Sequence, residues 1–343
     1  MSASRMSSGD GSPVDHLHYR QLGQTDLHVS IIGFGASPLG DVFEVIDQEE
    51  GKRAVHMAVD EGINFFDVSP YYGRTLAEER LGTALQGRRH KVILGTKCGR
   101  YGASKFDFSA ERIAVGVDES LIRLRTDYVD LLQVHDLEFG DLQQIVDETI
   151  PAMRRLQTQG KARYIGITGY PLAALQQVAS ALPVDVILSY CHYNLLADDL
   201  ETTLTPFAST RGIGLINASP LHMGVLTEQG APKWHPAPSE IHDAARRAAD
   251  FCRSRGLDIS QIALRFCFEY PRVATTLVGM STQAQVKNSL HALRQPIDPA
   301  ITEEVRNILA PVLNRTWPSG RPENSTPTAL TSLRSSQPIA SAD

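Results

Sequence analysis

Short apolar runs recur eight times along this chain and alternate with longer amphipathic segments. Each run is nearly continuously apolar and rich in β-branched residues, which is typical of strands that are covered on both faces. The runs occupy residues 29–35, 63–69, 91–97, 128–135, 162–168, 184–190, 212–219 and 273–279. The chain is therefore expected to contain eight buried strands.

The segments between the runs carry helix signals. Residues 49–62 begin with acidic side chains and end on a glycine, residues 109–124 begin on a serine, and residues 141–157 end before a glycine. An alternation of strand, helix and strand about every thirty residues requires right-handed crossovers and a parallel sheet. Eight such units predict an α/β fold of the (β/α)8 TIM-barrel class.

An open doubly wound sheet is the competing architecture. A sheet of that kind usually carries a G-x-G-x-x-G nucleotide turn after its first strand. The glycines of GFGASPLG, residues 33–40, do not have that spacing. The closed barrel is therefore favoured.

Further segments flank the eight units. Residues 18–30 have the pattern of a small hairpin, which would close the bottom of a barrel, and residues 295–314 predict an extra helix on its outside. Residues 1–16 and 317–343 are polar and carry too little apolar content to favour ordering. We therefore expect one barrel domain over residues 17–316 between two disordered tails.

The composition favours a small-molecule ligand. The formal net charge is −6 and the chain has no block of Lys or Arg, which argues against nucleic acid or an anionic membrane as a partner. No apolar run approaches the ~20 residues that cross a bilayer. The four cysteines form no C-x-x-C pair, which predicts reduced thiols in the cytoplasm. Because nothing indicates an obligate interface, we expect a monomer.

Polar side chains stand at the ends of four consecutive predicted strands. They are Asp67, Lys97, His135 and Thr168. In a barrel of this class the active site lies at the C-terminal ends of the strands. Each residue alone has a simpler explanation as a loop cap, a counterion or a packed core side chain. Together with the nearby Tyr72, however, they predict a carboxylate, a phenol, an ammonium and an imidazole around one cavity.

Such a set suits proton transfer by a tyrosine. A phenol has an unperturbed pKa near ~10 and transfers protons poorly at neutral pH. An ammonium some 4 Å away at an effective dielectric of about 20 contributes roughly 4 kcal/mol, enough to lower that pKa by ~3 units. We therefore expect Lys97 to lower the pKa of Tyr72. Asp67 would keep the lysine charged, and His135 would hydrogen-bond a substrate oxygen.

The motifs DVSPYYG, ILGTKCG and LLQVHD resemble the Asp, Tyr, Lys and His tetrad of the aldo-keto reductases, in order and in the five-residue step from Asp67 to Tyr72. The resemblance covers residues 18–316 and implies a (β/α)8 barrel with a bound nicotinamide dinucleotide and no metal. Further motifs, among them FDFSAERI, ILSYCHY and LVGMS, are similar to the plant-type L-galactose dehydrogenase branch of that family. This branch implies an aldose 1-dehydrogenase that oxidises L-galactose, L-fucose or D-arabinose to its lactone.

The resemblance also implies where the dinucleotide binds, chiefly in the loops after the last two strands. The implied contacts are Gly35, Asp67, Thr168, Gly169, Tyr190, Ser219, Pro220, Leu221, Gly224, Gly279, Ser281, Gln285 and Asn288. NAD is favoured over NADP, because Ser281 and Gln285 stand where family members that hold the 2′-phosphate place Arg or Lys.

The sequence departs from the family pattern around the nicotinamide. Thr168, Gly169 and approximately Tyr190 occupy the positions of the Ser, Asn and Gln that usually hold the carboxamide. Ala218 replaces the tyrosine that usually stacks on the ring, and the asparagine of the adenine loop comes one residue early, as Asn288. The positioning of the nicotinamide therefore stays open.

The predicted substrate contacts are polar and aromatic residues, because both kinds suit a hydroxylated ring. They are Tyr72, Tyr101, His135, Phe139, His192, His222 and Trp234. In the expected oxidation Tyr72 removes the proton from the C1 hydroxyl of an aldose hemiacetal while C1 delivers hydride to NAD. His135 holds the reacting oxygen.

Three alternatives remain. A carbonyl reductase of secondary metabolism would use the same fold and the same tetrad. A metal-dependent TIM-barrel hydrolase would also gather Asp and His at strand ends, although the first strand carries no H-x-H motif. A non-catalytic nicotinamide-sensing subunit would bind the dinucleotide, although the intact tetrad argues against a loss of chemistry.

Overall fold

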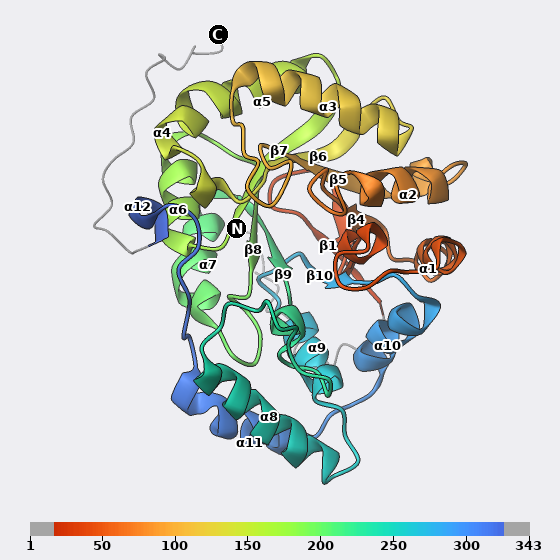
Figure 1. The fold of residues 1–343 in the computed structure, drawn as a ribbon, viewed down its shortest axis with the longest axis vertical. Coiled ribbons are helices and arrows are strands. Elements are labelled where there is room, and N and C mark those ends of the chain that lie inside the picture. Colours follow the sequence, from red (N-terminus) through yellow and green to blue (C-terminus); the bar gives the residue numbers. More distant parts are fainter. Residues whose placement is uncertain (1–16, 326–343) are drawn as a thin grey trace, which may run out of the picture.

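Eight parallel strands close into a barrel in the computed structural model, which describes residues 17–325 (Figure 1). The strands are β3 (Ile32–Gly35), β4 (Phe65–Asp67), β5 (Ile93–Cys98), β6 (Val129–Val134), β7 (Ala162–Gly169), β8 (Val186–Tyr190), β9 (Gly214–Ala218) and β10 (Thr275–Gly279). They follow the barrel in chain order, and β10 closes the ring between β9 and β3. Each predicted apolar run overlaps one strand of the barrel, so the (β/α)8 prediction is confirmed.

The strands are buried because the barrel interior covers one face and the surrounding helices cover the other. Every residue of β4 and β6 is buried. The register places Asp67 between Gly35 of β3 and Gly95 of β5. Because neighbouring strands are parallel, the polar residues at their C-terminal ends lie at the same end of the barrel.

Helices surround the barrel (Figure 1). They are α1 (Gln48–Asp60), α2 (Leu76–Ala84), α3 (Ala110–Leu124), α5 (Ile150–Thr158), α6 (Leu172–Ala181), α7 (Asp199–Arg211), α9 (Ile259–Glu269) and α10 (Gln283–Arg294). A short α4 (Leu142–Gln144) continues through a π turn (Ile145–Thr149) into α5. The predicted serine cap of α3 is present, since Ser109 Oγ accepts the Arg112 N–H at 3.3 Å.

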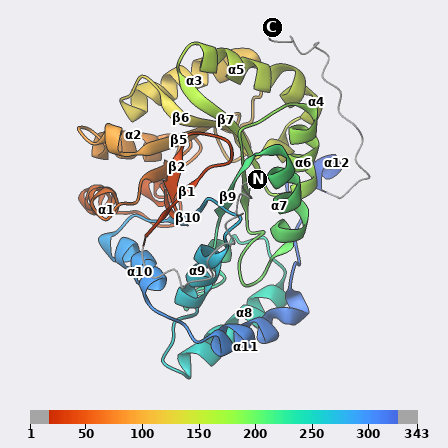
Figure 2. The ribbon, with the colours of Figure 1, turned by 180° about the vertical axis from the view of Figure 1, so that it is seen from behind.

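Two further helices pack against each other outside the barrel. They are α8 (Ser239–Arg253) and α11 (Pro299–Leu309), which lie beyond α9 at one end of the molecule (Figure 2). The Asp298 carboxylate caps α11 by accepting the Ala300 N–H at 2.9 Å. The extra C-terminal helix is therefore confirmed.

The N-terminal hairpin consists of β1 (Tyr19–Gln21) and β2 (His28–Ser30), which pair antiparallel (Figure 2). Leu22 and Leu27 are buried and belong to a cluster with barrel residues such as Phe65. The hairpin is tied to the start of β9 through the Gln24 N–H, which donates to Gly212 O at 2.9 Å. It closes the end of the barrel opposite the strand C-termini, as predicted.

The chain after α11 differs from the prediction of a tail that starts at residue 317. Trp317 is only 9% exposed and stacks on Tyr170 with ring centroids 4.7 Å apart. Residues Pro322–Ser325 form α12, and the Asn324 amide donates to two backbone carbonyls. The tail prediction is therefore wrong for residues 317–325, because one aromatic ring and a few backbone hydrogen bonds order a segment of otherwise polar composition. Residues 1–16 and 326–343 lie outside the described residues.

Neither a membrane-spanning helix nor a disulfide bond is present among residues 17–325. No helix in this range is both long and apolar enough to cross a membrane. The cysteines are all free and buried, and they are Cys98, Cys191, Cys252 and Cys267.

Candidate active site

The ends of β4, β5 and β6 bring Asp67, Lys97 and His135 together. Asp67 is the last residue of β4, Lys97 precedes the last residue of β5, and His135 directly follows β6. The Lys97 ammonium forms an ion pair with the Asp67 carboxylate, and the two side chains are 2% and 4% exposed. Tyr72 comes from the loop after β4, and the Lys97 Nζ lies 5.2 Å from the centroid of its ring. The structure thus gathers the four predicted residues in one cluster.

Two further groups hold this ion pair in place. The Lys97 ammonium also donates to Val68 O at 3.0 Å, and the Gln133 amide donates to the second carboxylate oxygen of Asp67 at 2.8 Å. Gln133 is fully buried inside β6 and was not predicted as a site residue. The signal in the sequence is a single amide within the apolar run YVDLLQVH. Its hydrogen bond fixes the carboxylate that anchors the lysine.

His135 is held by a hydroxyl and lies edge-on to the catalytic tyrosine candidate. Its Nδ1 is 2.8 Å from Ser69 Oγ, and its ring centroid is 5.6 Å from that of Tyr72 at 83°. Burial and the positive charges of Lys97 and Arg100 lower the pKa of His135 well below its usual value. The imidazole is therefore neutral at physiological pH, and its Nε2 remains for another partner.

The charge balance around Tyr72 differs from the expectation. Burial raises the pKa of Tyr72 to about 12, and the Lys97 ammonium opposes the rise without reversing it. The expected net decrease in the pKa of Tyr72 was therefore wrong for the protein without ligands. The physical reason is that burial disfavours the phenolate more than the Lys97 ammonium favours it, and the Asp67 and Asp136 carboxylates raise the pKa of Tyr72 further.

A second group of charges lies beside the tetrad and was not predicted. Arg100 forms an ion pair with Asp136, whose carboxylate Oδ2 lies 3.6 Å from His135 Nε2. Burial raises the pKa of Asp136, and the Arg100 guanidinium opposes that rise. Burial and the Asp136 charge raise the pKa of Glu138 to about 8. Glu138 therefore carries a proton near neutral pH, whereas Asp136 is the carboxyl group that pairs with the arginine.

The predicted nicotinamide contacts lie at the ends of β7 and β8. Thr168 Oγ accepts the Asp136 N–H at 3.1 Å, and the Tyr190 hydroxyl is 3.4 Å from the Glu138 carboxyl. Tyr190 is half-buried. A Cβ on Gly169 would lie 2.8 Å from that same carboxyl, so no larger residue fits there without a shift. Where many family members have amide side chains, this protein thus has a buried carboxyl with a phenol.

The loops after β3, β9 and β10 hold the other predicted dinucleotide contacts. Gly35 and Gly279 pair in the last register position of β3 and β10. Ser219, Pro220, Leu221 and Gly224 form a compact loop after β9. In that loop the His222 N–H donates to Ser219 O at 2.9 Å. Hydroxyls and backbone N–H groups at the ends of the last two strands fit the needs of a pyrophosphate.

Side chains of the protein accept hydrogen bonds from the backbone N–H groups at the start of α10. The Gln285 amide oxygen accepts the N–H groups of Ser281 and Thr282 at 2.7 and 3.1 Å. The Glu50 carboxylate, which projects from α1, accepts the Gln283 N–H at 2.8 Å. Asn288 lies further along α10 on its exposed side. A carboxylate, which is also paired with Arg53 at 2.8 Å, therefore already occupies the start of α10.

Two of the predicted substrate contacts, Tyr101 and Trp234, pack against residues outside the tetrad. Tyr101 directs its hydroxyl at α3, since a Cβ on Gly116 would lie 2.6 Å from it and the hydroxyl donates to Arg112 O at 3.4 Å. Trp234 is 54% exposed and faces Phe43 at 6.2 Å between ring centroids. Neither residue is brought into contact with the tetrad.

Phe139, His192 and His222, three more of the predicted substrate contacts, each pack against a different aromatic ring. Phe139 stacks on Phe106 at 4.6 Å, with the Arg100 guanidinium 5.3 Å from its ring. His192 lies 4.7 Å from the Tyr170 ring and is bonded through Nδ1 to Asp199. His222 contacts Trp317 edge-on with ring centroids 5.3 Å apart. Trp317, in the ordered segment after α11, thus packs against His222. The sequence did not indicate this contact.

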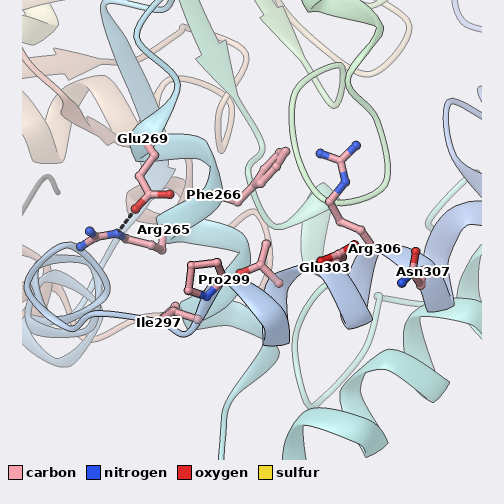
Figure 3. Close-up of a pocket in the computed structure, with 9 residues that line it drawn as sticks. Arg265, Phe266, Glu269, Ile297, Pro299, Glu303, Arg306 and Asn307 are labelled. Atoms are coloured by element: carbon pink, nitrogen blue, oxygen red, sulfur yellow. Dashed lines mark hydrogen bonds and ion pairs between the residues drawn. The ribbon is translucent and has the colours of Figure 1, made fainter. Parts of the chain in front are cut away.

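A surface cleft of about 370 Å³ lies away from these residues, between α9 and α11 (Figure 3). Both arginines that line it have partners, since Arg265 pairs with Glu269 at 2.6 Å and Arg306 with Asp198 at 2.8 Å. Figure 3 shows Arg265 and Glu269 on α9 and Arg306 on α11. The cleft holds none of the predicted site residues, so its size gives it no link to the tetrad.

The fold and this site define a class of protein. The model of the Aldo/keto reductase family matches residues 31–310, and the chain belongs to this family. It is 48% identical to L-galactose dehydrogenase of Arabidopsis thaliana over 90% of this chain and 99% of that protein. It is 28% identical to D-threo-aldose 1-dehydrogenase of a Pseudomonas species over 76% of this chain and 88% of that protein.

A solved structure supports the same assignment. The holo form of the aldo-keto reductase AKR11C1 from Bacillus halodurans matches with a TM-score of 0.72 and 29% identity, over 85% of this chain and 96% of that chain. The protein is therefore an oxidoreductase of a family whose members use nicotinamide cofactors. This family assignment contradicts the alternative of a metal-dependent TIM-barrel hydrolase. Among residues 17–325, no three His, Cys, Asp or Glu side chains are grouped to hold a metal ion.

Proposed function

We propose that this protein is an aldose 1-dehydrogenase that oxidises L-galactose, or a related sugar such as L-fucose or D-arabinose, to its lactone with NAD as acceptor. The observation that carries the proposal is the similarity to L-galactose dehydrogenase over nearly the full length of both chains. The cluster of Asp67, Lys97, Tyr72 and His135 supports it, because these groups provide a proton acceptor next to a neutral hydrogen-bonding imidazole.

The residues divide the work as follows. The C1 hydroxyl of the hemiacetal binds between the Tyr72 hydroxyl and His135 Nε2, and Tyr72 takes its proton. The Lys97 ammonium stabilises the phenolate, while Asp67 and Gln133 keep the ammonium in position. Residues at the ends of β7 to β10 would hold the oxidised nicotinamide, which would supply the hydride acceptor. His135 stays neutral and positions the reacting oxygen.

NAD is the proposed cofactor rather than NADP. The Glu50 carboxylate at the first turn of α10 supports this choice, because it would repel a 2′-phosphate there. Ser281 and Gln285, at the same turn, are uncharged. A phosphate at this position would need a cationic fork, which neither residue offers.

The proposal is tested with a panel of aldoses. The full-length protein is mixed with NAD or NADP at alkaline pH, and reduction of the cofactor is followed by absorbance. We expect turnover with L-galactose and NAD, weaker turnover with the other sugars, and no effect of a metal chelator. Carbonyl reduction with NADPH and no aldose oxidation would replace the proposal by the carbonyl reductase alternative. Binding of NADH without any turnover would point to a sensing subunit.

We also propose that the protein works in the cytoplasm as a monomer. The free, buried cysteines support a reducing compartment. Light scattering on the purified protein tests the oligomeric state. A mass of twice the chain would reject the monomer.

A further inference from the structure

The loop after β6 places a second carboxylate at the reacting centre. Asp136 directly follows His135, and its Oδ2 lies 3.6 Å from His135 Nε2. Since Nδ1 of the same ring is engaged by Ser69, Nε2 is the nitrogen that faces the reacting oxygen. A group that touches the reacting oxygen at Nε2 is therefore within reach of Asp136, which has no role in the proton transfer described above.

Asp136 is held from two neighbouring strands. Arg100, which follows β5, forms the ion pair, and the Asp136 N–H donates to Thr168 Oγ of β7 at 3.1 Å. The Asp136 backbone has a left-handed φ of 48°. This conformation is unfavourable for residues with a side chain, although Asp tolerates it better than most, and such strain concentrates at functional sites. The carboxylate is thus fixed in direction before a ligand arrives.

The arginine has hydrogen-bonding capacity to spare. Its guanidinium stacks on Tyr71 at 3.8 Å and lies 5.2 and 5.3 Å from the rings of Phe106 and Phe139. The Arg100 Nε is buried and has no hydrogen-bond partner within residues 17–325. A buried ion pair contributes little to stability on balance, because desolvation offsets the attraction. An arginine and a carboxylate between aromatic rings instead match a hydroxylated ring as a ligand.

We propose that Asp136, positioned by Arg100, binds the hydroxyl group on the carbon next to the reacting carbon. The substrate class is then an α-hydroxy hemiacetal, an aldose with a free 2-hydroxyl, and this inference rests on the proposed sugar oxidation. The spacing fits, because oxygens on adjacent carbons lie roughly 3 Å apart, the length of a hydrogen bond. An oxygen bound at His135 Nε2 brings its neighbour to the Asp136 carboxylate. Asp136 is a specificity-determining residue in this arrangement.

The test compares a sugar with its 2-deoxy analogue. We expect the wild-type protein to oxidise L-galactose with a kcat/KM about 10- to 100-fold above that of 2-deoxy-L-galactose, the effect of one hydrogen bond to a charged group. In Asp136→Asn the ratio falls toward one, because kcat/KM drops for L-galactose and changes little for the analogue. Asp118→Asn is the matched control, since Asp118 pairs with Lys161 on the outside of the barrel and should leave both values unchanged.

Binding of NADH, followed by fluorescence titration, should be equal in wild type, Asp136→Asn and the control. Equal oxidation of both sugars by the wild type would overturn the inference and leave the proposed function intact. No oxidation of any aldose by the wild type would instead overturn the proposed function. An equal loss for both sugars in Asp136→Asn would show that Asp136 only supports the structure. If that variant does not fold, Arg100→Lys gives the same comparison, with a smaller loss of discrimination.

Discussion

Tyr72 is the residue on which the proposed chemistry depends, and its surroundings show how burial and charge compete. Lys97 provides the attraction for a phenolate, yet burial, assisted by the charge of Asp67, outweighs it and raises the pKa of Tyr72 in the protein alone. Near neutral pH Tyr72 is therefore a phenol, and it must lose its own proton to solvent before it can accept the proton of the substrate hydroxyl. Ser69 and Gln133 orient His135 and Asp67, so the tetrad is held by a surrounding layer of hydrogen bonds.

Removal of the phenol hydroxyl should stop the reaction without affecting cofactor binding. For Tyr72→Phe we expect kcat to fall by roughly 10²- to 10⁴-fold, the usual contribution of a positioned acid or base. NADH affinity, measured by fluorescence titration, should stay within twofold of wild type. Tyr128→Phe is the control, because Tyr128 precedes β6 at the opposite end of the barrel and is 37% exposed. Substantial turnover in Tyr72→Phe would remove Tyr72 from the catalytic role.

The raised pKa of Tyr72 predicts a direction for the pH dependence. Because the phenolate accepts the proton in oxidation and the phenol pKa is about 12, the reactive fraction grows as the pH rises toward that value. The pKa of His135 is far below its usual range, so His135 contributes no change above neutrality. We expect kcat/KM for sugar oxidation to increase steadily from pH 7 to pH 10. A flat profile over this range would exclude Tyr72 as the titrating base.

At the scale of elements, the contact between α1 and α10 bears on cofactor choice. A helix N-terminus normally offers free N–H groups to an anion. Here the Gln285 amide accepts the N–H groups of Ser281 and Thr282 just before α10. The Glu50 carboxylate, which is paired with Arg53, accepts the first N–H group of the helix. In the proposed choice of NAD over NADP, the two helices together, rather than either alone, would form the barrier to a 2′-phosphate.

Neutralising that charge should strengthen NADPH binding selectively. For Glu50→Gln we expect NADPH to bind roughly two- to fivefold more tightly, because the amide oxygen keeps the hydrogen bond while the repulsion is lost. NADH affinity should be unchanged, and the gain should shrink at high salt. Glu49→Gln is the matched control, since Glu49 is exposed on the same turn and its side chain makes no contact with α10. A similar gain in both variants would indicate a general charge effect instead.

At the scale of the whole molecule, the ordered C-terminal segment joins the barrel to its outer helices. Trp317 lies against Tyr170 after β7 and against His222 after β9. Its backbone N–H contacts the Tyr170 hydroxyl at 3.4 Å. The segment therefore ties two strand ends together across the face that carries the site.

Loss of this ring should destabilise the protein. For Trp317→Ala we expect the free energy of unfolding to fall by about 3 kcal/mol, the usual cost of removing a large buried aromatic side chain. The other tryptophan provides the comparison, because Trp234 is 54% exposed and Trp234→Ala should cost much less. Urea unfolding followed by circular dichroism measures both. Equal losses would show that the segment after α11 does not pack as described.

The eightfold alternation, the hairpin, the C-terminal helix and the tetrad could be predicted from local pattern alone. Buried parallel strands need continuous apolar runs, and a polar residue at the end of such a run is visible in one dimension. Asp67, Lys97 and His135 are examples, since each terminates a run. Contacts between side chains on strands that are far apart in the chain could not be predicted in this way, because they depend on how the barrel closes. Both the contact of Gln133 with Asp67 and the ion pair of Arg100 with Asp136 depend on that closure.

The sequence by itself thus determined the architecture and the kind of chemistry, because both follow from periodicity and residue type. The tertiary structure alone decided the sign of the Tyr72 pKa shift, the direction of Tyr101 and the order of the segment around Trp317. These depend on burial and on the net field of several charges at short range. Such quantities are sums over neighbours in space, and a linear pattern does not contain them.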